Sequence, residues 1–588
     1  MNENKYTENS VIKYRPLPEN ISMFKLLVYM LGCLRISDIL IILFATAMIT
    51  LVGTLYPMAC NLLYNQILPA HKNSLLWSVF LIFIGIVVVG ALFSVIKNIL
   101  LSGIRIRMSV MTEAAFFGRC LSLPVGFYRA NPPGQVSEWM NEIPAFCKNF
   151  SDLIFGTWFS SLFALLYLIQ IGYYVPSMLP FSAITIASLF AVCFVIALLQ
   201  SKWTKKRLVS TSVMTQTLYD LFYGVEKIKL NDAKKQAYQI WEDSYKDVSR
   251  YTYNPPVPVK LGMVLPMMIS SAVSVLALIV AGSYGLSAGE YMVFYSAFGM
   301  ILGAAVSAGQ TANLIASVKP EYELLSTILT TKPEYMGKSD MSQKTEELNI
   351  EVKNLSFSYP SGKRILENLS LTIPQGDYVA IVGRTGCGKS TLIRLLLGFE
   401  IPDSGEILYN GIGLMNQNLM DIRGNIGVVL QNDRLFPGSI YENMKMANPD
   451  VTDDEIWEAL RIAGMEEDVK RMPMQLHTHI GERSFFSGGQ NQRLQIARAI
   501  LGKPKLLIMD EATSALDNET QAGIAAALDA MDCTRIVVAH RLSTIKNTKR
   551  ILVIDNGHIV EDGDYKTLME NKNFFYELVC RQLGSADV

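Results

Sequence analysis

The chain has 588 residues, more than one ordinary domain, and half of them are hydrophobic while only 18% are charged. That composition is too apolar for a purely soluble protein and predicts a membrane portion. Basic and acidic residues balance at 52 each, so the net charge gives no reason to expect nucleic-acid binding. The eight cysteines include no C-x-x-C pair, which argues against a disulfide framework or a zinc site.

The first 37 residues precede any apolar run of membrane-spanning length. Residues 1–20 lack an apolar core, so we expect no cleavable signal peptide. Residues 21–34, ISMFKLLVYMLGCL, surround the single Lys25 with apolar side chains and predict a helix on the inner membrane surface. We therefore predict a cytoplasmic N-terminal region with an interfacial helix over 1–37, too short for an additional catalytic domain.

Long apolar runs follow, and each is near the twenty residues that cross a bilayer. They predict six spans at 38–60, 74–100, 152–172, 177–200, 260–285 and 290–313. Lysine and arginine are concentrated in the gaps 101–151 and 201–259, which places these gaps and both termini in the cytoplasm. The spans contain almost no ionisable residues, which argues against ion-coupled transport. We assign a transmembrane domain to 38–318 and a linker to 319–347.

A phosphate-binding loop begins the functional part of the soluble region, 348–588. The apolar run YVAIVG at 378–383 predicts a strand, GRTGCGKST at 383–391 matches the loop, and the residues after it favour a helix. Backbone amides would hold the phosphates, Lys389 would reach the terminal ones, and the Ser390 hydroxyl would bind magnesium. The candidate nucleotide-binding residues here are Gly383, Arg384, Thr385, Gly386, Cys387, Gly388, Lys389, Ser390 and Thr391.

Two further apolar runs end in residues suited to hydrolysis. LLIM at 506–509 predicts a buried strand that ends in Asp510 and Glu511. Asp510 suits an outer ligand of magnesium, and Glu511 suits a general base that polarises the attacking water. IVVAH at 536–540 predicts another strand, which ends in His540 and brings that side chain toward the terminal phosphate.

With FSGGQ at 486–490, these motifs resemble those of an ATP-binding cassette (ABC) exporter subunit, with the transmembrane domain ahead of the ATPase domain. The resemblance implies a type IV half-transporter: six transmembrane helices fused to an α/β P-loop ATPase of RecA-like fold, with a helical subdomain at about 430–495. It also implies roles for residues outside the loop. Tyr359 would stack on adenine, Gln431 would contact magnesium or water, and 514–517 would connect two ATP sites through Asp517. The signature residues Ser487, Gly488, Gly489 and Gln490 would bind ATP held by a partner subunit.

The expected activity is therefore ATP-driven export, with ATP and Mg²⁺ as cofactors. Because one chain carries both halves of the site, a homodimer is favoured, and a heterodimer stays open. Stretches such as GVVLQNDRLFPGSIYENM resemble bacterial peptide and bacteriocin exporters, which suggests a peptide or an amphipathic small molecule as cargo and the bacterial plasma membrane as location. The alternatives are a multidrug or lipid exporter of the same architecture, and a membrane sensor that uses the ATPase cycle without moving cargo.

Overall fold

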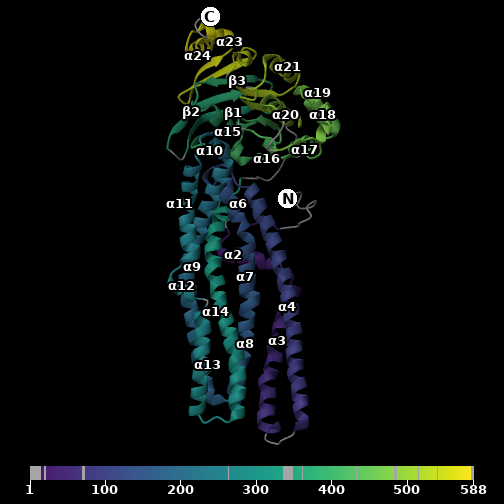
Figure 1. Ribbon diagram of the computed structural model, residues 1–588. Helices are drawn as coiled ribbons and strands as arrows, with labels where there is room; N and C mark the ends of the chain where they lie inside the picture. The colour runs from purple at the N-terminus through teal and green to yellow at the C-terminus, as the bar shows by residue number, and fades with distance from the viewer. Residues whose placement is uncertain are drawn as a thin grey trace. The chain divides into compact units, whose positions relative to one another are not determined.

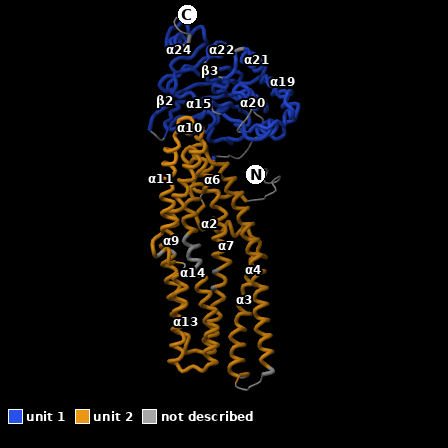
Figure 2. Tube along the Cα trace, in the orientation of Figure 1, with its two compact units in different colours: residues 1–2, 334–588 blue, residues 3–333 orange. Residues whose placement is uncertain are grey.

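The computed structural model describes residues 15–18, 21–68, 73–262, 264–334, 348–359, 362–431, 433–481, 486–513, 515–539 and 541–583. The chain divides into two compact units at the bond between Pro333 and Glu334 (Figure 2). The sequence boundary at 318 falls inside the last helix of the first unit, α14, which continues to Thr330. The first part of the predicted linker is therefore helical.

The first unit is all helical, and its longest helices run side by side (Figure 1). Its elements are α2 (Met23–Gly32), α3 (Ile36–Leu62), η1 (Leu63–Ile67), α4 (Asn73–Leu121), α5 (Val125–Ala130), α6 (Pro133–Asn141), α7 (Ile143–Ser151), η2 (Asp152–Trp158), α8 (Phe159–Tyr174), η3 (Pro176–Met178), α9 (Leu179–Tyr223), α10 (Val225–Leu230), α11 (Lys234–Tyr253), α12 (Val257–Leu261), α13 (Leu265–Ser283) and α14 (Ala288–Thr330).

Among the described residues, five helices are long and apolar enough to cross a membrane. They overlap five of the six predicted spans, and the helix in the predicted span 260–285 is shorter than predicted, at Leu265–Ser283. The remaining one, 152–172, is divided between η2, a π-helical segment of 7 residues, and α8, with 16 residues. These two elements follow each other without a gap, so together they supply the length of the sixth span.

The predicted interfacial helix is α2. One of its faces is buried, because Leu26 and Met30 pack in a cluster with residues of α4, α7 and α14. On the opposite face, Phe24 is 74% exposed. The helix is therefore attached to the membrane unit on one side and leaves an apolar side for lipid.

A buried carboxylate lies where α14 extends beyond its apolar part. Glu321 is 4% exposed and accepts a hydrogen bond of 2.7 Å from the Asn149 amide of α7. Burial and, to a smaller extent, the charge of Glu142 raise the pKa of Glu321 to about 7, although the Asn149 and Ser317 hydrogen bonds and Arg207 act in the opposite direction. This carboxyl group therefore titrates near neutral pH.

The second unit is built on a six-stranded sheet with the order β12-β11-β3-β10-β9-β6, accompanied by a four-stranded sheet, β2-β1-β4-β5, and the pair β7-β8. The strands are β1 (Ile350–Ser358), β2 (Arg364–Ile373), β3 (Tyr378–Gly383), β4 (Ser404–Tyr409), β5 (Ile412–Gly413), β6 (Ile426–Val429), β7 (Gly438–Ser439), β8 (His479–Ile480), β9 (Leu506–Asp510), β10 (Thr534–Val538), β11 (Arg550–Asp555) and β12 (His558–Gly563).

The central strands β3, β9 and β10 are parallel and buried almost throughout, as their unbroken apolar sequences predict. Their side chains alternate between two hydrophobic clusters. Leu507 and Met509 belong to one cluster, whereas Leu506 and Ile508 belong to the other. Each cluster therefore covers one face of the sheet.

The helices of the second unit are α15 (Lys389–Leu396), η4 (Leu414–Asn416), α16 (Leu419–Arg423), α17 (Ile440–Ala447), α18 (Asp453–Ile462), α19 (Glu466–Lys470), η5 (Gln475–His477), α20 (Gly488–Ile500), α21 (Asn518–Asp529), α22 (Leu542–Lys546), α23 (Tyr565–Glu570) and α24 (Phe574–Leu583). Of these, α17 to α20 form the predicted helical subdomain.

Candidate functional site

Four adjacent parallel strands direct the candidate residues to one edge of the sheet. β3 leads into the phosphate loop, β6 into Gln431, and β9 ends in Asp510 and Glu511. Because the carboxyl ends of parallel strands lie at the same edge, these residues share one region. β10 leads toward His540, which lies outside the described residues, as does Ser514.

Glycines in the phosphate loop occupy places where a side chain would collide. A Cβ on Gly383 would lie 2.2 Å from the Ile554 carbonyl oxygen, and one on Gly388 would lie 2.6 Å from a Leu366 methyl. Gly388 has φ of 109° and immediately precedes α15. The loop is therefore closely packed on β11 and β2, with its backbone free to approach a ligand.

The Lys389 ammonium is buried at the start of α15. Its Nζ donates to the carbonyl oxygens of Gly383 and Arg384, at 2.9 and 3.0 Å. The neighbouring Cys387 thiol is also buried, and burial raises its pKa, while the Lys389 charge acts in the opposite direction. Cys387 is therefore a poorly reactive thiol in this loop.

Gln431 and Glu511 are brought together. The Gln431 amide nitrogen donates to the Glu511 carboxylate at 3.0 Å, across the adjacent strand ends of β6 and β9. Glu511 has φ of 54°, which an L-residue adopts only where its surroundings hold it. Asp510 is 3% exposed. The strand edge thus presents two carboxylates and one amide within a small region.

Tyr359 follows β1 and faces the first turn of α15. Its hydroxyl lies 3.4 Å from the Thr391 hydroxyl and accepts a hydrogen bond of 3.4 Å from Arg394. Its ring is half-buried and meets Phe357 edge-on, at 5.0 Å between centroids. The Arg384 guanidinium lies over the Phe574 ring at 4.9 Å. These contacts place two aromatic rings beside the phosphate loop and its helix.

The signature residues form the N-terminus of α20. The Ser487 hydroxyl accepts a hydrogen bond from the Gln490 backbone N–H at 3.2 Å, and the Gln490 side chain accepts one from the Ser487 N–H at 2.9 Å. This reciprocal pair is a capping box. Ser487 and Gly488 are exposed, so the end of the helix offers its N–H groups to a ligand. Gln490 instead uses its side chain to stabilise the helix.

Residues 515–517 are tied to the signature helix. The Ala515 N–H donates to the Gln492 side chain of α20 at 2.9 Å. A Cβ on Gly489 would lie only 3.1 Å from the Ala515 carbonyl oxygen. Asp517 caps α21, because its carboxylate accepts from the Thr520 N–H at 2.8 Å, and this bond lowers the pKa of Asp517. The connecting loop is therefore packed between two helix starts.

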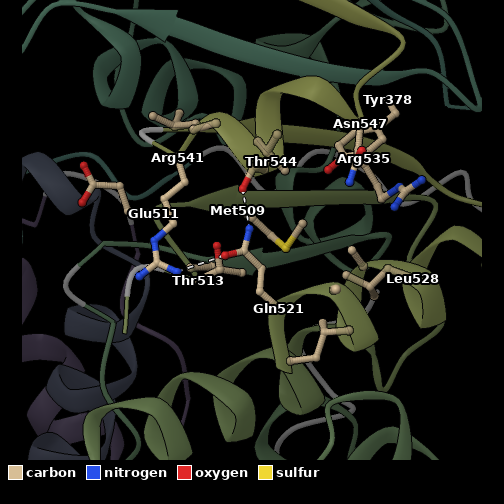
Figure 3. Close-up of a pocket in the computed structure, with 17 residues that line it drawn as sticks. Tyr378, Met509, Glu511, Thr513, Gln521, Leu528, Arg535, Arg541, Thr544 and Asn547 are labelled. Carbon is tan, nitrogen blue, oxygen red and sulfur yellow. Dashed lines mark hydrogen bonds between the residues drawn. The ribbon is translucent and has the colours of Figure 1, made fainter. Parts of the chain in front are cut away.

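Arg541, which the sequence analysis did not identify, also holds the 515–517 loop in place. Its guanidinium donates to the Leu516 carbonyl at 2.7 Å and to the Gln521 side chain at 3.0 Å. The Gln521 amide in turn donates to the Thr544 hydroxyl at 2.7 Å (Figure 3). The only sequence signal for Arg541 is its position directly after His540. These bonds connect the segment after β10 to the 515–517 loop.

This network lines one end of a cavity of about 130 Å³. The apolar wall is formed by β9, β10 and α21, and includes Met509, Ile524 and Val537, while Glu511 and Arg541 lie at the polar end (Figure 3). The candidate base and the loop network therefore border the same space.

Comparisons with known proteins agree with this geometry. Residues 366–514 match the family model described as ABC transporter, and 39–305 match the ABC transporter transmembrane region. The chain is 31% identical over 506 residues to the beta-(1→2)glucan export ATP-binding/permease protein NdvA of Rhodopseudomonas palustris (strain BisA53), covering 82% of this chain and 81% of that protein. The chain belongs to the ABC transporter family.

Other relatives are exporters of the same family. The chain is 29% identical over 551 residues to the alpha-hemolysin translocation ATP-binding protein HlyB of Escherichia coli O157:H7, covering 91% of this chain and 77% of that protein. Its fold is similar to a solved bacterial Atm1-family ABC exporter with ATP bound, with a TM-score of 0.85 and 22% identity, over 94% of this chain and 98% of that one. This ABC transporter is a multi-pass membrane protein and an ATP-binding ATPase that drives export.

Proposed function

We propose that the chain exports a peptide or polypeptide by alternating access. HlyB and the leukotoxin translocation protein LktB of Mannheimia haemolytica, 30% identical over 518 residues, are named for moving protein toxins. NdvA is named for the export of a glucan, so relatives are not confined to peptide cargo, and an amphipathic small molecule is the alternative. In this proposal ATP binding favours the outward-facing state and hydrolysis resets it, because only a ligand with different affinities for two states shifts their balance.

Within the site, Glu511 acts as the general base. The observation that carries this assignment is its 3.0 Å hydrogen bond to Gln431, which orients the carboxylate at the strand edge. The strained backbone at Glu511 is consistent with a position fixed for function. His540 would contact the terminal phosphate and Tyr359 the adenine. The phosphate loop, 383–391, would hold the phosphates through its N–H groups and Lys389.

The residues at this edge also fit Mg²⁺. Hydroxyl, amide and carboxylate oxygens are the ligands this ion prefers, and Ser390, Gln431 and Asp510 supply one of each. Because the Gln431 nitrogen faces Glu511, its amide oxygen is left for a metal or a water. A bound Mg²⁺ would neutralise charge on the phosphates.

We further propose that two copies form the working unit. The exposed signature end of α20, Ser487 and Gly488 with Gly489, has N–H donors that would bind ATP held by the partner subunit. A homodimer is favoured because this chain has both halves of the site, and a heterodimer is the alternative. The domain roles are 1–37 interfacial, 38–318 transmembrane, 319–347 linker and 348–588 ATPase, with both termini cytoplasmic in a bacterial plasma membrane.

The test uses full-length protein in inverted membrane vesicles. ATP-dependent accumulation of a fluorescent peptide series is compared with that of a fluorescent lipid and a cationic drug, with Glu511→Gln as the inactive control. Accumulation of peptide and not of the other two supports the proposal. Accumulation of only lipid or drug identifies the alternative exporter, and ATPase activity without any accumulation favours a sensor.

A further inference from the structure

The middle of α4 makes two polar contacts, at different depths, with the continuous segment formed by η2 and α8. Arg105 of α4 donates to Asp152 of η2 at 2.7 Å. Lys97 lies eight residues earlier in α4, and at 1.5 Å per residue this is about 12 Å farther into the span. Its Nζ donates to the Ser160 hydroxyl at 2.8 Å, eight residues after Asp152. Lys97 therefore lies in the predicted span 74–100, beyond the ion pair that marks its cytoplasmic end.

The Ser160 hydroxyl does not balance this charge. It donates its own proton to the Gly156 carbonyl at 2.8 Å, so it meets Lys97 as an acceptor only. This bond fixes the position of the ammonium and uses one of its three N–H groups. Two N–H groups remain for another acceptor.

Two other basic residues of α4 pair with carboxylates, Arg105 with Asp152 and Arg107 with Asp38, each at 2.7 Å. Arg119 lies beyond the predicted span and donates to the carbonyl oxygens of Leu329 and Thr331 at 3.3 and 3.0 Å. In the described part of α4, Lys97 is the basic residue whose recorded partner is a neutral hydroxyl alone. Its side chain is also half-buried among neighbouring residues.

The sequence offers no spare carboxylate at this depth. The six predicted spans contain Asp38, Asp152 and Glu290. Asp38 and Asp152 pair with arginines, and Glu290 accepts hydrogen bonds from Ser287 at the beginning of α14. A second copy of this chain would add only the same three. Ionisable residues within membrane spans are rare and are usually paired, so one that meets no carboxylate indicates a functional site.

We propose that the Lys97 ammonium binds the anionic oxygen group, phosphate or carboxylate, of an amphipathic molecule in the inner half of the bilayer. Phe93 and Leu100 lie one turn before and one turn after Lys97 on the same face of α4, and both are partly exposed, so they provide an apolar surface for the rest of such a molecule. The source is a membrane phospholipid or the exported molecule. The assignment depends on the membrane position of α4 and is independent of the peptide cargo proposed above.

Binding is tested with full-length protein in phosphatidylcholine nanodiscs. The probes are a fluorescent C12 fatty acid and its methyl ester, which differ only in the negative charge. We expect the wild type to prefer the acid by about tenfold, and Lys97→Met to lose this preference. Lys97→Arg should keep it. Ser160→Asp should lose it, because that substitution supplies the missing carboxylate internally.

Lys25→Met in α2 is the matched control, because it removes one exposed charge elsewhere in the membrane unit. Phosphatidylglycerol added to the nanodisc then separates the two sources. If it competes with the acid in the wild type, a phospholipid headgroup occupies the site. If it does not compete, the site is reserved for the exported molecule. An acid preference that is unchanged within about twofold in Lys97→Met overturns the proposal, as does an equal loss in Lys25→Met.

Discussion

Replacing Arg541 by methionine should slow ATP hydrolysis without weakening ATP binding. Arg541 donates a 2.7 Å hydrogen bond to the carbonyl of the buried Leu516. It also donates to the Gln521 side chain at 3.0 Å (Figure 3). Methionine keeps the apolar stem and removes every donor. The phosphate loop makes no hydrogen bond to Arg541 in the described residues, so nucleotide affinity should be retained.

The size of the effect follows from the bond to the Leu516 carbonyl alone. Hydrogen bonds to a charged group contribute about 1.5–3 kcal/mol, and the carbonyl of this buried residue then lacks this donor. A loss of this size is smaller than the 5–15 kcal/mol stability typical of a domain, so the ATPase unit should still fold. If the lost bond allows the 515–517 loop to leave its hydrolytic position, each 1.4 kcal/mol of that free energy lowers kcat about tenfold. We expect kcat to fall between about tenfold and a hundredfold.

The assay is steady-state ATP hydrolysis by full-length protein in nanodiscs, with kcat and KM measured separately. Thr544→Val is the matched control, because it removes the 2.7 Å bond from Gln521 and leaves the Arg541–Leu516 bond in place. Its kcat should fall by less than that of Arg541→Met. A kcat within about twofold of wild type, or a raised KM at constant kcat, would refute the reasoning.

Three further predictions concern single side chains. Glu511→Gln should retain ATP binding and lower turnover by about a hundredfold or more, measured by nucleotide binding and phosphate release; near-normal turnover would exclude Glu511 as the base. Ser487→Arg should block ATP-induced dimerisation of isolated ATPase domains that also carry Glu511→Gln, measured by light scattering; persistent dimers would contradict the signature assignment. Glu321→Gln should raise the thermal stability of the protein at pH 8 by up to about 3 kcal/mol, because the folded-state pKa of Glu321 is about 7 and the ionised form is disfavoured. That gain should disappear as pH falls from 7 to about 4.5, where wild-type Glu321 is protonated, and a gain independent of pH would show that Glu321 does not titrate in this range.

The ATPase core could be predicted because its signals are local. Residues 378–391 combine a buried strand, a loop and a helix start in one continuous sequence, and the order of these elements is the motif itself. The apolar run before Asp510 and Glu511 indicated a buried parallel strand, and the structure has β9 there. The hydrogen bond between Gln431 and Glu511 was not predicted, because it depends on β6 and β9 being neighbours in the sheet.

Other features required the three-dimensional structure. Arg541 donates to a carbonyl 25 residues away in the sequence, and Lys97 donates to Ser160, 63 residues away. Contacts at such separations do not produce a periodic pattern in the sequence. The hydropathy of residues 152–172 predicted a single span, because hydropathy depends on composition alone. It does not indicate the hydrogen-bond pattern that makes η2 π-helical. The capping role of Gln490 was not predicted, although S-x-x-Q is the sequence pattern of a capping box.

That capping box means that the beginning of α20 and its ligand contact depend on one side chain. The Ser487 oxygen already accepts the Gln490 N–H, so its own proton remains to be donated outward. Gln490 in turn holds the Ser487 backbone through its amide oxygen. A substitution at 490 that loses this amide would therefore have the same effect as a defect in the signature serine, although Ser487 itself is unchanged. Inactive variants at the two positions would differ in the helicity of the first turn of α20.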